Sequence, residues 1–165
     1  MSYNLNQNET FETKLALLLE ILSKKHAALT DVLNISENQE TLYLSPPSET
    51  RRDFLIEMGK QKQKQIDEVL ACDEVFQRIF DSITDEFAEK KDNYKEQVQR
   101  LQVGINLILE LDVKIRAQEE KGKALAVASF NQPATSQTDI NPANTNYIIN
   151  RYKEASKNRP EEQKL

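Results

Sequence analysis

Apolar residues in the first third of the chain recur at intervals of three and four positions. The series is Phe11, Leu15, Leu18, Leu22, Leu29 and Val32, with Lys25 in its one polar slot. This spacing puts the apolar side chains on one face of an α-helix and predicts a helix over about residues 9–43. Asn8 or Thr10 can cap its start. We expect the stretch 34–38 to fray, because its Asn and Ser side chains compete for backbone hydrogen bonds.

Two adjacent prolines, Pro46 and Pro47, separate this helix from a second one, and the next proline is Pro133. Ser45 or Ser48 can cap the second helix, with both prolines in its first turn, where the missing N–H groups have no intrahelical partner to lose. The repeat of three and four then resumes with Ile66, Val69, Asp73, Phe76, Phe80, Ile83 and Phe87. Such a repeat is typical of a helix that packs lengthwise along a partner helix.

A third amphipathic stretch follows a charged run in which Asp92–Asn93 is the best candidate for a turn. Its apolar row is Tyr94, Val98, Leu101, Ile105, Ile108, Asp112 and Ile115. The row predicts a helix over about residues 93–128, with fraying from Gly122. Further apolar residues lie beside the row, at Val103, Leu107, Leu109, Leu111 and Val113. One neighbouring helix cannot cover so wide an apolar surface.

The three predicted helices are each about 35 to 43 residues, or roughly 50 to 65 Å, long. Helices of similar length with short connections fold back on one another. The sequence therefore predicts an all-α fold, an elongated antiparallel three-helix bundle of coiled-coil-like character, over residues 1–130. The alternative has no break at Asp92, so that the second and third stretches form a single rod that must dimerise to bury its apolar row.

Residues 131–165 have a different composition, rich in Asn, Gln, Thr, Ser and Pro, which predicts a flexible tail. A short amphipathic segment lies within it, formed by Tyr147, Ile148, Ile149 and Tyr152. On a short helix, Ile148 and Ile149 share a face with Tyr152. The segment either docks on its own bundle or binds a partner.

The composition argues against most enzymes. The 165 residues include three Gly, one Cys, one His and no Trp, and the formal net charge is −5. These numbers do not suffice for a glycine-rich phosphate loop, a Cys/His metal cage or a disulfide, so we expect no enzymatic activity, no cofactor and no metal site. An acidic chain without a basic stripe is not expected to bind nucleic acid. Without a long apolar run or a signal sequence, the chain is expected to be cytoplasmic and not inserted into a membrane.

The single histidine and the single cysteine fit structural positions better than catalytic ones. His26 lies on the wide apolar face of the first helix and is expected to be a packing or edge residue. Cys72 is followed by Asp73 and Glu74, which disfavour a thiolate, so we expect a buried structural thiol.

Two carboxylates interrupt the apolar rows, Asp73 in the second helix and Asp112 in the third. A carboxylate in such a place is costly unless it is paired. Lys25 or Lys62 on a facing helix can supply the charge, and such a pair would fix the alignment of the helices. The pair Glu119–Glu120 is interpreted as ordinary solvated charge.

Parts of the first two helices resemble the flagellar export chaperones of the FlgN and FliT type. The resemblance lies in the leucine-rich run LALLLEIL at 15–22 and in FLIEMGKQKQKQIDEVL at 54–70, which leads to DEVF at 73–76. The third segment, LQVGINLILEL at 101–111, is similar in character. The resemblance implies a cytosolic chaperone that binds flagellar subunits such as the hook-filament junction proteins and prevents their premature assembly.

In such families the end of the long helical region and the segment after it hold the client. The over-apolar third helix and its tail are the corresponding surfaces in this chain, and an amphipathic helix of the client would dock there. The expected partner-binding residues are Leu107, Leu111, Leu125, Val127, Phe130, Tyr147, Ile148, Ile149 and Tyr152. The alternative is a structural coiled-coil protein whose exposed apolar positions mediate homo-oligomerisation.

Overall fold

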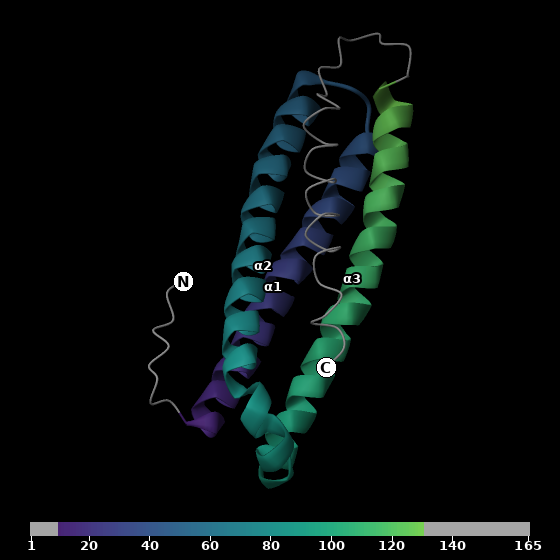
Figure 1. Ribbon diagram of the computed structural model, residues 1–165. Helices are drawn as coiled ribbons and strands as arrows, with labels where there is room; N and C mark the ends of the chain where they lie inside the picture. The colour runs from purple at the N-terminus through teal and green to yellow at the C-terminus, as the bar shows by residue number, and fades with distance from the viewer. Residues whose placement is uncertain (1–9, 131–165) are drawn as a thin grey trace.

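A computed structural model describes residues 10–130 of the chain. This part is almost entirely helical, and the all-α prediction is confirmed. Three long helices, α1 (Phe11–Leu44), α2 (Glu49–Lys90) and α3 (Lys95–Phe130), follow one another, with a short 3-10 helix, η1 (Lys91–Tyr94), between the last two. Figure 1 shows that the chain turns back after α1 and again at η1. Within residues 10–130, no helix has both the length and the apolar character needed to cross a membrane.

The starts of α1 and α2 are fixed by hydroxyl caps. The side chain of Thr10 accepts a hydrogen bond from the backbone N–H of Thr13, and that of Ser48 accepts one from Arg51. Pro46 and Pro47 lie in the connection before Ser48, so the prediction that they occupy the first turn of α2 was wrong. Ser48 rather than Ser45 is the cap, because its extended backbone lets its hydroxyl reach the first N–H groups of the helix.

The predicted turn near Asp92–Asn93 is present as η1, which interrupts the helix between α2 and α3. The single continuous rod is therefore not the conformation of this chain. Two predicted weak points are regular helix instead: α1 is continuous through 34–38, and α3 is continuous past Gly122 to Phe130. In both places packing against a neighbouring helix overrides the weak helical preference of the local residues.

The hydrophobic core is built around α1, which packs along both α2 and α3. Most core residues form one cluster that extends from Phe11 to Val32 on α1 and includes Ile66 to Ile83 of α2 and Leu101 to Ile115 of α3. At the η1 end the ring of Phe11 lies 5.3 Å from that of Tyr94 and 6.2 Å from that of Phe87, measured between centroids. These rings close the η1 end of the core.

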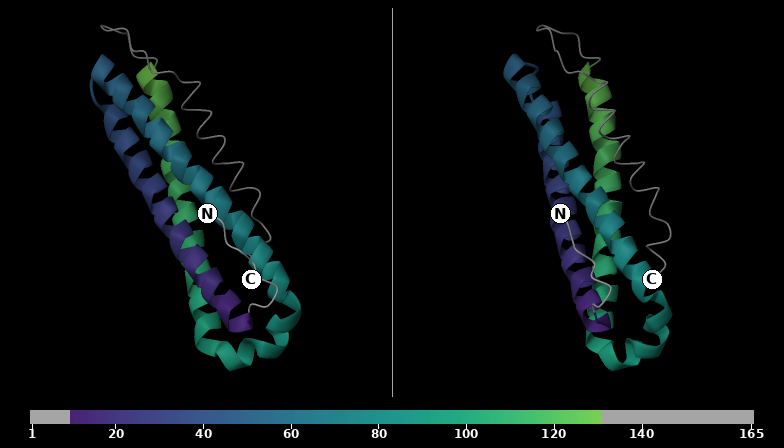
Figure 2. Two further views of the ribbon diagram at one scale, coloured as in Figure 1. Left: turned by 90° about the vertical axis from the view of Figure 1, so that its left-hand side faces the viewer. Right: turned by 60° about the vertical axis from the view of Figure 1, so that its left-hand side comes forward.

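A second, much smaller cluster lies at the opposite end, where α1 joins α2 and α3 ends. It consists of buried Tyr43, Leu55 and Ala126, with Leu42 and Leu125 packed against it. Figure 2 shows, from two further sides, the η1 turn at one end of the molecule and the α1–α2 connection beside the end of α3 at the other. The two ends of the core therefore differ greatly in apolar content.

Candidate functional site

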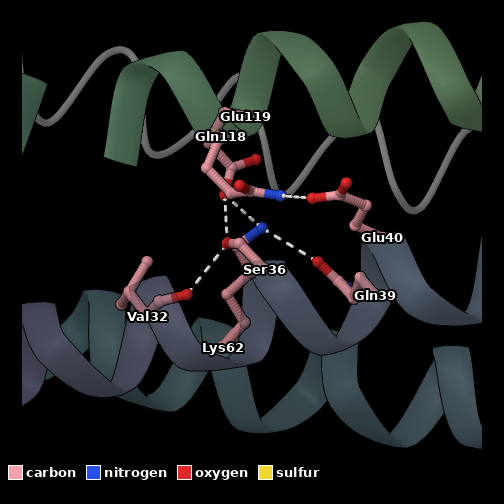
Figure 3. A network of polar contacts seen from close by, with 7 residues as sticks. All are labelled: Val32, Ser36, Gln39, Glu40, Lys62, Gln118 and Glu119. Atoms are coloured by element: carbon pink, nitrogen blue, oxygen red, sulfur yellow. Dashed lines mark hydrogen bonds and ion pairs between the residues drawn. The ribbon is translucent and has the colours of Figure 1, made fainter. Parts of the chain in front are cut away.

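A network of buried polar side chains lies between the two apolar clusters (Figure 3). Lys62 of α2 is 1% exposed and Glu119 of α3 is 2% exposed, and the two form an ion pair. The Lys62 ammonium also donates a hydrogen bond of 3.0 Å to Oε1 of Gln39 on α1. The Ser36 hydroxyl lies 2.6 Å from Oε1 of Glu119 and 2.8 Å from the carbonyl oxygen of Val32. One polar layer thus joins all three helices.

The network is electrostatically demanding. Burial lowers the pKa of Lys62, and the nearby Glu119 carboxylate opposes this by favouring the charged ammonium. Burying two charges costs several kcal/mol per ion before their attraction is counted. The hydrogen bond that Ser36 donates to Glu119 and the one that Gln39 accepts from Lys62 help to offset that cost. Such a layer contributes less to net stability than an apolar layer would, but it strongly opposes any shift of one helix past another.

Glu119 was predicted to be an ordinary solvated charge, and that prediction was wrong. The missed signal is its spacing, because Glu119 follows Ile115 by four positions and so continues the row that contains Ile108 and Asp112. Its neighbour Glu120 is exposed, as predicted. A carboxylate that continues an apolar row is better interpreted as buried and paired.

A second buried ion pair lies inside the large cluster. Lys25 of α1 and Asp73 of α2 form it, and their side chains are 8% and 12% exposed. The prediction that Asp73 is paired with a lysine of a facing helix is confirmed, with Lys25 as the partner, while Lys62 pairs with Glu119. Asp112, the other carboxylate in an apolar row, is also buried, at 3% exposed.

A third polar cluster closes the end of the molecule that holds the small apolar cluster. Arg51, 3% exposed, donates hydrogen bonds to the carbonyl oxygen of Ser45 and to the hydroxyl of Ser129. Burial lowers the pKa of Arg51. This one side chain ties the α1–α2 connection to the last turn of α3.

The outer edge of the contact between α1 and α3 is also polar. Glu40 forms an ion pair of 2.6 Å with Lys121 and accepts a hydrogen bond from the amide of Gln118. The hydrogen bond with Lys121, followed by that with Gln118, lowers the pKa of Glu40. The flank of α3 that carries Gln118 and Lys121 therefore faces α1.

The single cysteine is a structural thiol in the described structure. Cys72 has no exposed surface. Burial, followed by the charges of Glu68 and Asp73, raises its pKa from 9.0 to about 11. A thiol in this setting is a poor nucleophile at neutral pH.

The single histidine, His26, is exposed. Among residues 10–130, no three His, Cys, Asp or Glu side chains are grouped as a metal site requires.

Several large apolar side chains of α3 are exposed. Leu107 is 47% and Val127 is 51% exposed, and both were predicted to be surface residues of this helix. Val103 and Val113 are 50% and 68% exposed. Leu125 is half-buried and packs against the small cluster.

Leu111 was predicted to lie on the binding surface, and the structure corrects this. It is 8% exposed and belongs to the large core cluster, because α3 turns this flank toward α1. The side chain of Phe130 and the residues Tyr147, Ile148, Ile149 and Tyr152 lie outside the described residues. Their predicted role stays a prediction.

Comparisons with known proteins give no family for this chain: no family model, no curated protein and no solved structure matches it.

Proposed function

We propose that this chain is a cytoplasmic binding protein of the flagellar export chaperone kind. In this proposal three antiparallel helices form one elongated, coiled-coil-like bundle that holds an amphipathic helix of an unassembled flagellar subunit, such as a hook-filament junction protein, and prevents premature assembly. The supporting observation is the exposure of Val103 and Leu107, two large apolar side chains four positions apart on α3. The resemblance of residues 15–22 and 54–76 to such chaperones suggests the class of client.

The physical basis of binding is the apolar surface that a client helix would cover. Fully burying a Val or Leu side chain is worth about 1.5–3 kcal/mol. Val103 and Leu107 are already about half covered, so each would contribute on the order of 1 kcal/mol. Such contributions suit a partner that is held in the cytoplasm and later released. The buried polar layer supports this role, since it keeps α3 in one register while its outer face is in use.

The experiment is a binding titration of a fluorescent peptide from the terminal helix of a hook-filament junction protein. We expect the double variant Val103→Asp/Leu107→Asp to weaken binding at least about tenfold, since it loses roughly 2 kcal/mol of apolar contact. Asn106→Asp is the matched control, because Asn106 is exposed on the same helix and the change adds charge without removing an apolar group. Recovery of no flagellar subunit with the full chain from a flagellated host would contradict the proposal.

A structural coiled-coil protein that acts through homo-oligomerisation is the second candidate. The observation that favours it is exposed apolar surface away from the α3 face, at Leu44 (68%) and Phe54 (55%). Sedimentation of the full chain at low micromolar concentration separates the two. A chaperone exchanges any self-association for its client, whereas a structural oligomer keeps its mass when the peptide is added.

A further inference from the structure

The side of the molecule between α2 and α3 is less closely packed than the two sides along α1. Both α2 and α3 pack along α1, whereas close backbone contacts between α2 and α3 are few. In the view of Figure 1 they lie on either side, with α1 behind. Lys62 and Glu119 bridge them at the polar layer. The side between these two helices is therefore a surface on which a further segment of chain can pack.

Helix geometry identifies the residues of this surface. On α3, Gln118 and Lys121 mark the flank toward α1, so the opposite flank faces α2. On α2, buried Cys72 lies beside α1, where its pKa responds to the charges of Lys24 and Lys25. The opposite flank faces α3. We define the α2–α3 face by two rows that follow intervals of four or seven: Ile56, Gln63, Leu70 and Gln77 on α2, with Leu109, Val113, Glu120 and Val127 on α3.

The α2–α3 face is partly apolar and incompletely covered. Leu70 and Leu109 are half-buried and pack on the large cluster. Ile56, Val113 and Val127 are 37%, 68% and 51% exposed. The face therefore offers apolar groups along much of its length.

The α2 edge of this face is acidic. Asp67, Glu74 and Asp81 are exposed and follow one another at intervals of seven. Asp67 and Asp81 each accept a hydrogen bond of 2.8 Å from a glutamine of the neighbouring row, Gln63 and Gln77 respectively. Glu74 forms an ion pair of 3.2 Å with exposed Arg78, so the edge carries three carboxylates beside one guanidinium. A segment that fits the face should carry apolar groups on one side and positive charge beside them.

The C-terminal part of the same chain has this character. Residues 147–159 contain Ile148, Tyr152 and Ala155 at helical spacing, together with four basic residues and one acidic residue. The 16 residues between Phe130 and Tyr147 can span about 55 Å when extended. The 36 residues of α3 are about as long, roughly 54 Å. The segment can therefore reach any level of the face from the end of α3.

We propose that residues 147–159 of this chain dock on the α2–α3 face, with the side that carries Ile148 and Tyr152 on its apolar residues and the basic side chains along Asp67, Glu74 and Asp81. The face is then an intramolecular interface rather than a site for a client, which leaves the outer surface at Val103 and Leu107 for other partners. The proposal does not depend on the function proposed above, because it involves no client.

Paramagnetic broadening in the full chain tests this directly. Ser156→Cys places a nitroxide label in the segment, and the native Cys72 stays unlabelled because it is buried. We expect amide signals of the α2–α3 face near Leu70 and Val113 to lose intensity, while signals near Asp31, on the exposed side of α1, keep theirs. An unchanged spectrum would overturn the proposal. A mixture of nitroxide-labelled chain with isotope-enriched chain that lacks the label separates docking within one chain from docking between two copies. Equal broadening in this mixture would mean that the segment of a second copy occupies the face, and it would also overturn the proposal.

Charge reversal then tests the acidic edge. The triple variant Asp67→Lys/Glu74→Lys/Asp81→Lys should abolish most of the broadening, and added salt should weaken it in the unmodified chain. The matched control reverses three exposed acidic residues of α1, in Glu20→Lys/Asp31→Lys/Glu37→Lys, and should leave the broadening intact. Circular dichroism confirms that both variants stay helical. Equal loss of broadening in the two triple variants would contradict docking at the acidic edge.

Discussion

The buried pair of Lys62 and Glu119 allows a sharp test of how the three helices are aligned. We consider three variants: Lys62→Met, Glu119→Leu and the two together. Each single change leaves one charge buried without its partner, because the two residues are 1% and 2% exposed. Removing one member of such a pair costs about 3–5 kcal/mol. That is a large share of the roughly 5–15 kcal/mol that stabilises a typical domain.

The double variant should behave very differently. It removes both charges, and replacing a buried pair with apolar side chains of similar volume is neutral or stabilising by about 1–4 kcal/mol. Gln39 loses the hydrogen bond from Lys62, at a cost of about 1–3 kcal/mol. Ser36 keeps the carbonyl oxygen of Val32 at 2.8 Å. We therefore expect the double variant to lie within about 2 kcal/mol of the unmodified chain, far from the sum of the two single effects.

Urea denaturation followed by far-UV circular dichroism measures the four free energies of unfolding, with the slope of each transition as a check on two-state behaviour. The matched control is the exposed pair Glu20 and Lys24, whose ion pair of 3.3 Å joins side chains that are 52% and 40% exposed. The corresponding changes there should have little effect. Single effects at Lys62 and Glu119 that simply add in the double variant would refute the reasoning, because they would mean that the two charges do not stabilise each other.

Two further predictions concern other buried polar groups. Because the pKa of Cys72 is about 11 when folded and its ordinary value is 9.0, the unfolded chain loses this proton first as the pH rises. The thiol's contribution to stability is therefore full below about pH 9 and declines by about 3 kcal/mol between pH 9 and 11. Denaturation of Cys72→Ala across this range should lack that decline, and an equal decline in both chains would contradict the assignment. Arg51→Met should lower the free energy of unfolding by about 2 kcal/mol, because the Ser45 carbonyl and the Ser129 hydroxyl lose their donor, whereas Arg78→Met at an exposed site of α2 should not. Equal urea midpoints for these two variants would show that Arg51 does not hold the end of α3.

The positions of the helices could be predicted from the sequence because each depends on local information. Spacings of three and four positions define the apolar face of a helix. Adjacent prolines mark the end of the first helix, and the run at Asp92–Asn93 carries the polar residues of a turn. The pairing of charges depends on distant information. Lys62 of α2 could face Asp112 or Glu119 of α3, and only the axial alignment of the two helices selects Glu119.

The exposed apolar residues of α3 could be predicted only in part, for a related reason. The excess of apolar residues on α3 correctly indicated that some must be exposed, and Leu107 and Val127 are. Which residues these are depends on the flank of α3 that meets α1. Leu111 lies on that flank and is buried, and Gly104 lies there too, where a Cβ atom would be 3.1 Å from Leu22. Sequence spacing defines a row on a helix but not the direction in which the row points.

The uneven division of the core has a consequence for how the molecule opens. Among residues 10–130, one side of the Lys62 layer holds nearly all of the apolar core, and the other side holds the small cluster of Tyr43, Leu55 and Ala126 with their neighbours. Local unfolding requires the least energy where few apolar contacts must be broken. Backbone amides near Ala126 should therefore exchange with solvent through partial opening, while those near Ile79 and Ile115 exchange only on global unfolding. The polar layer marks the boundary between two cooperative units within one continuous set of helices.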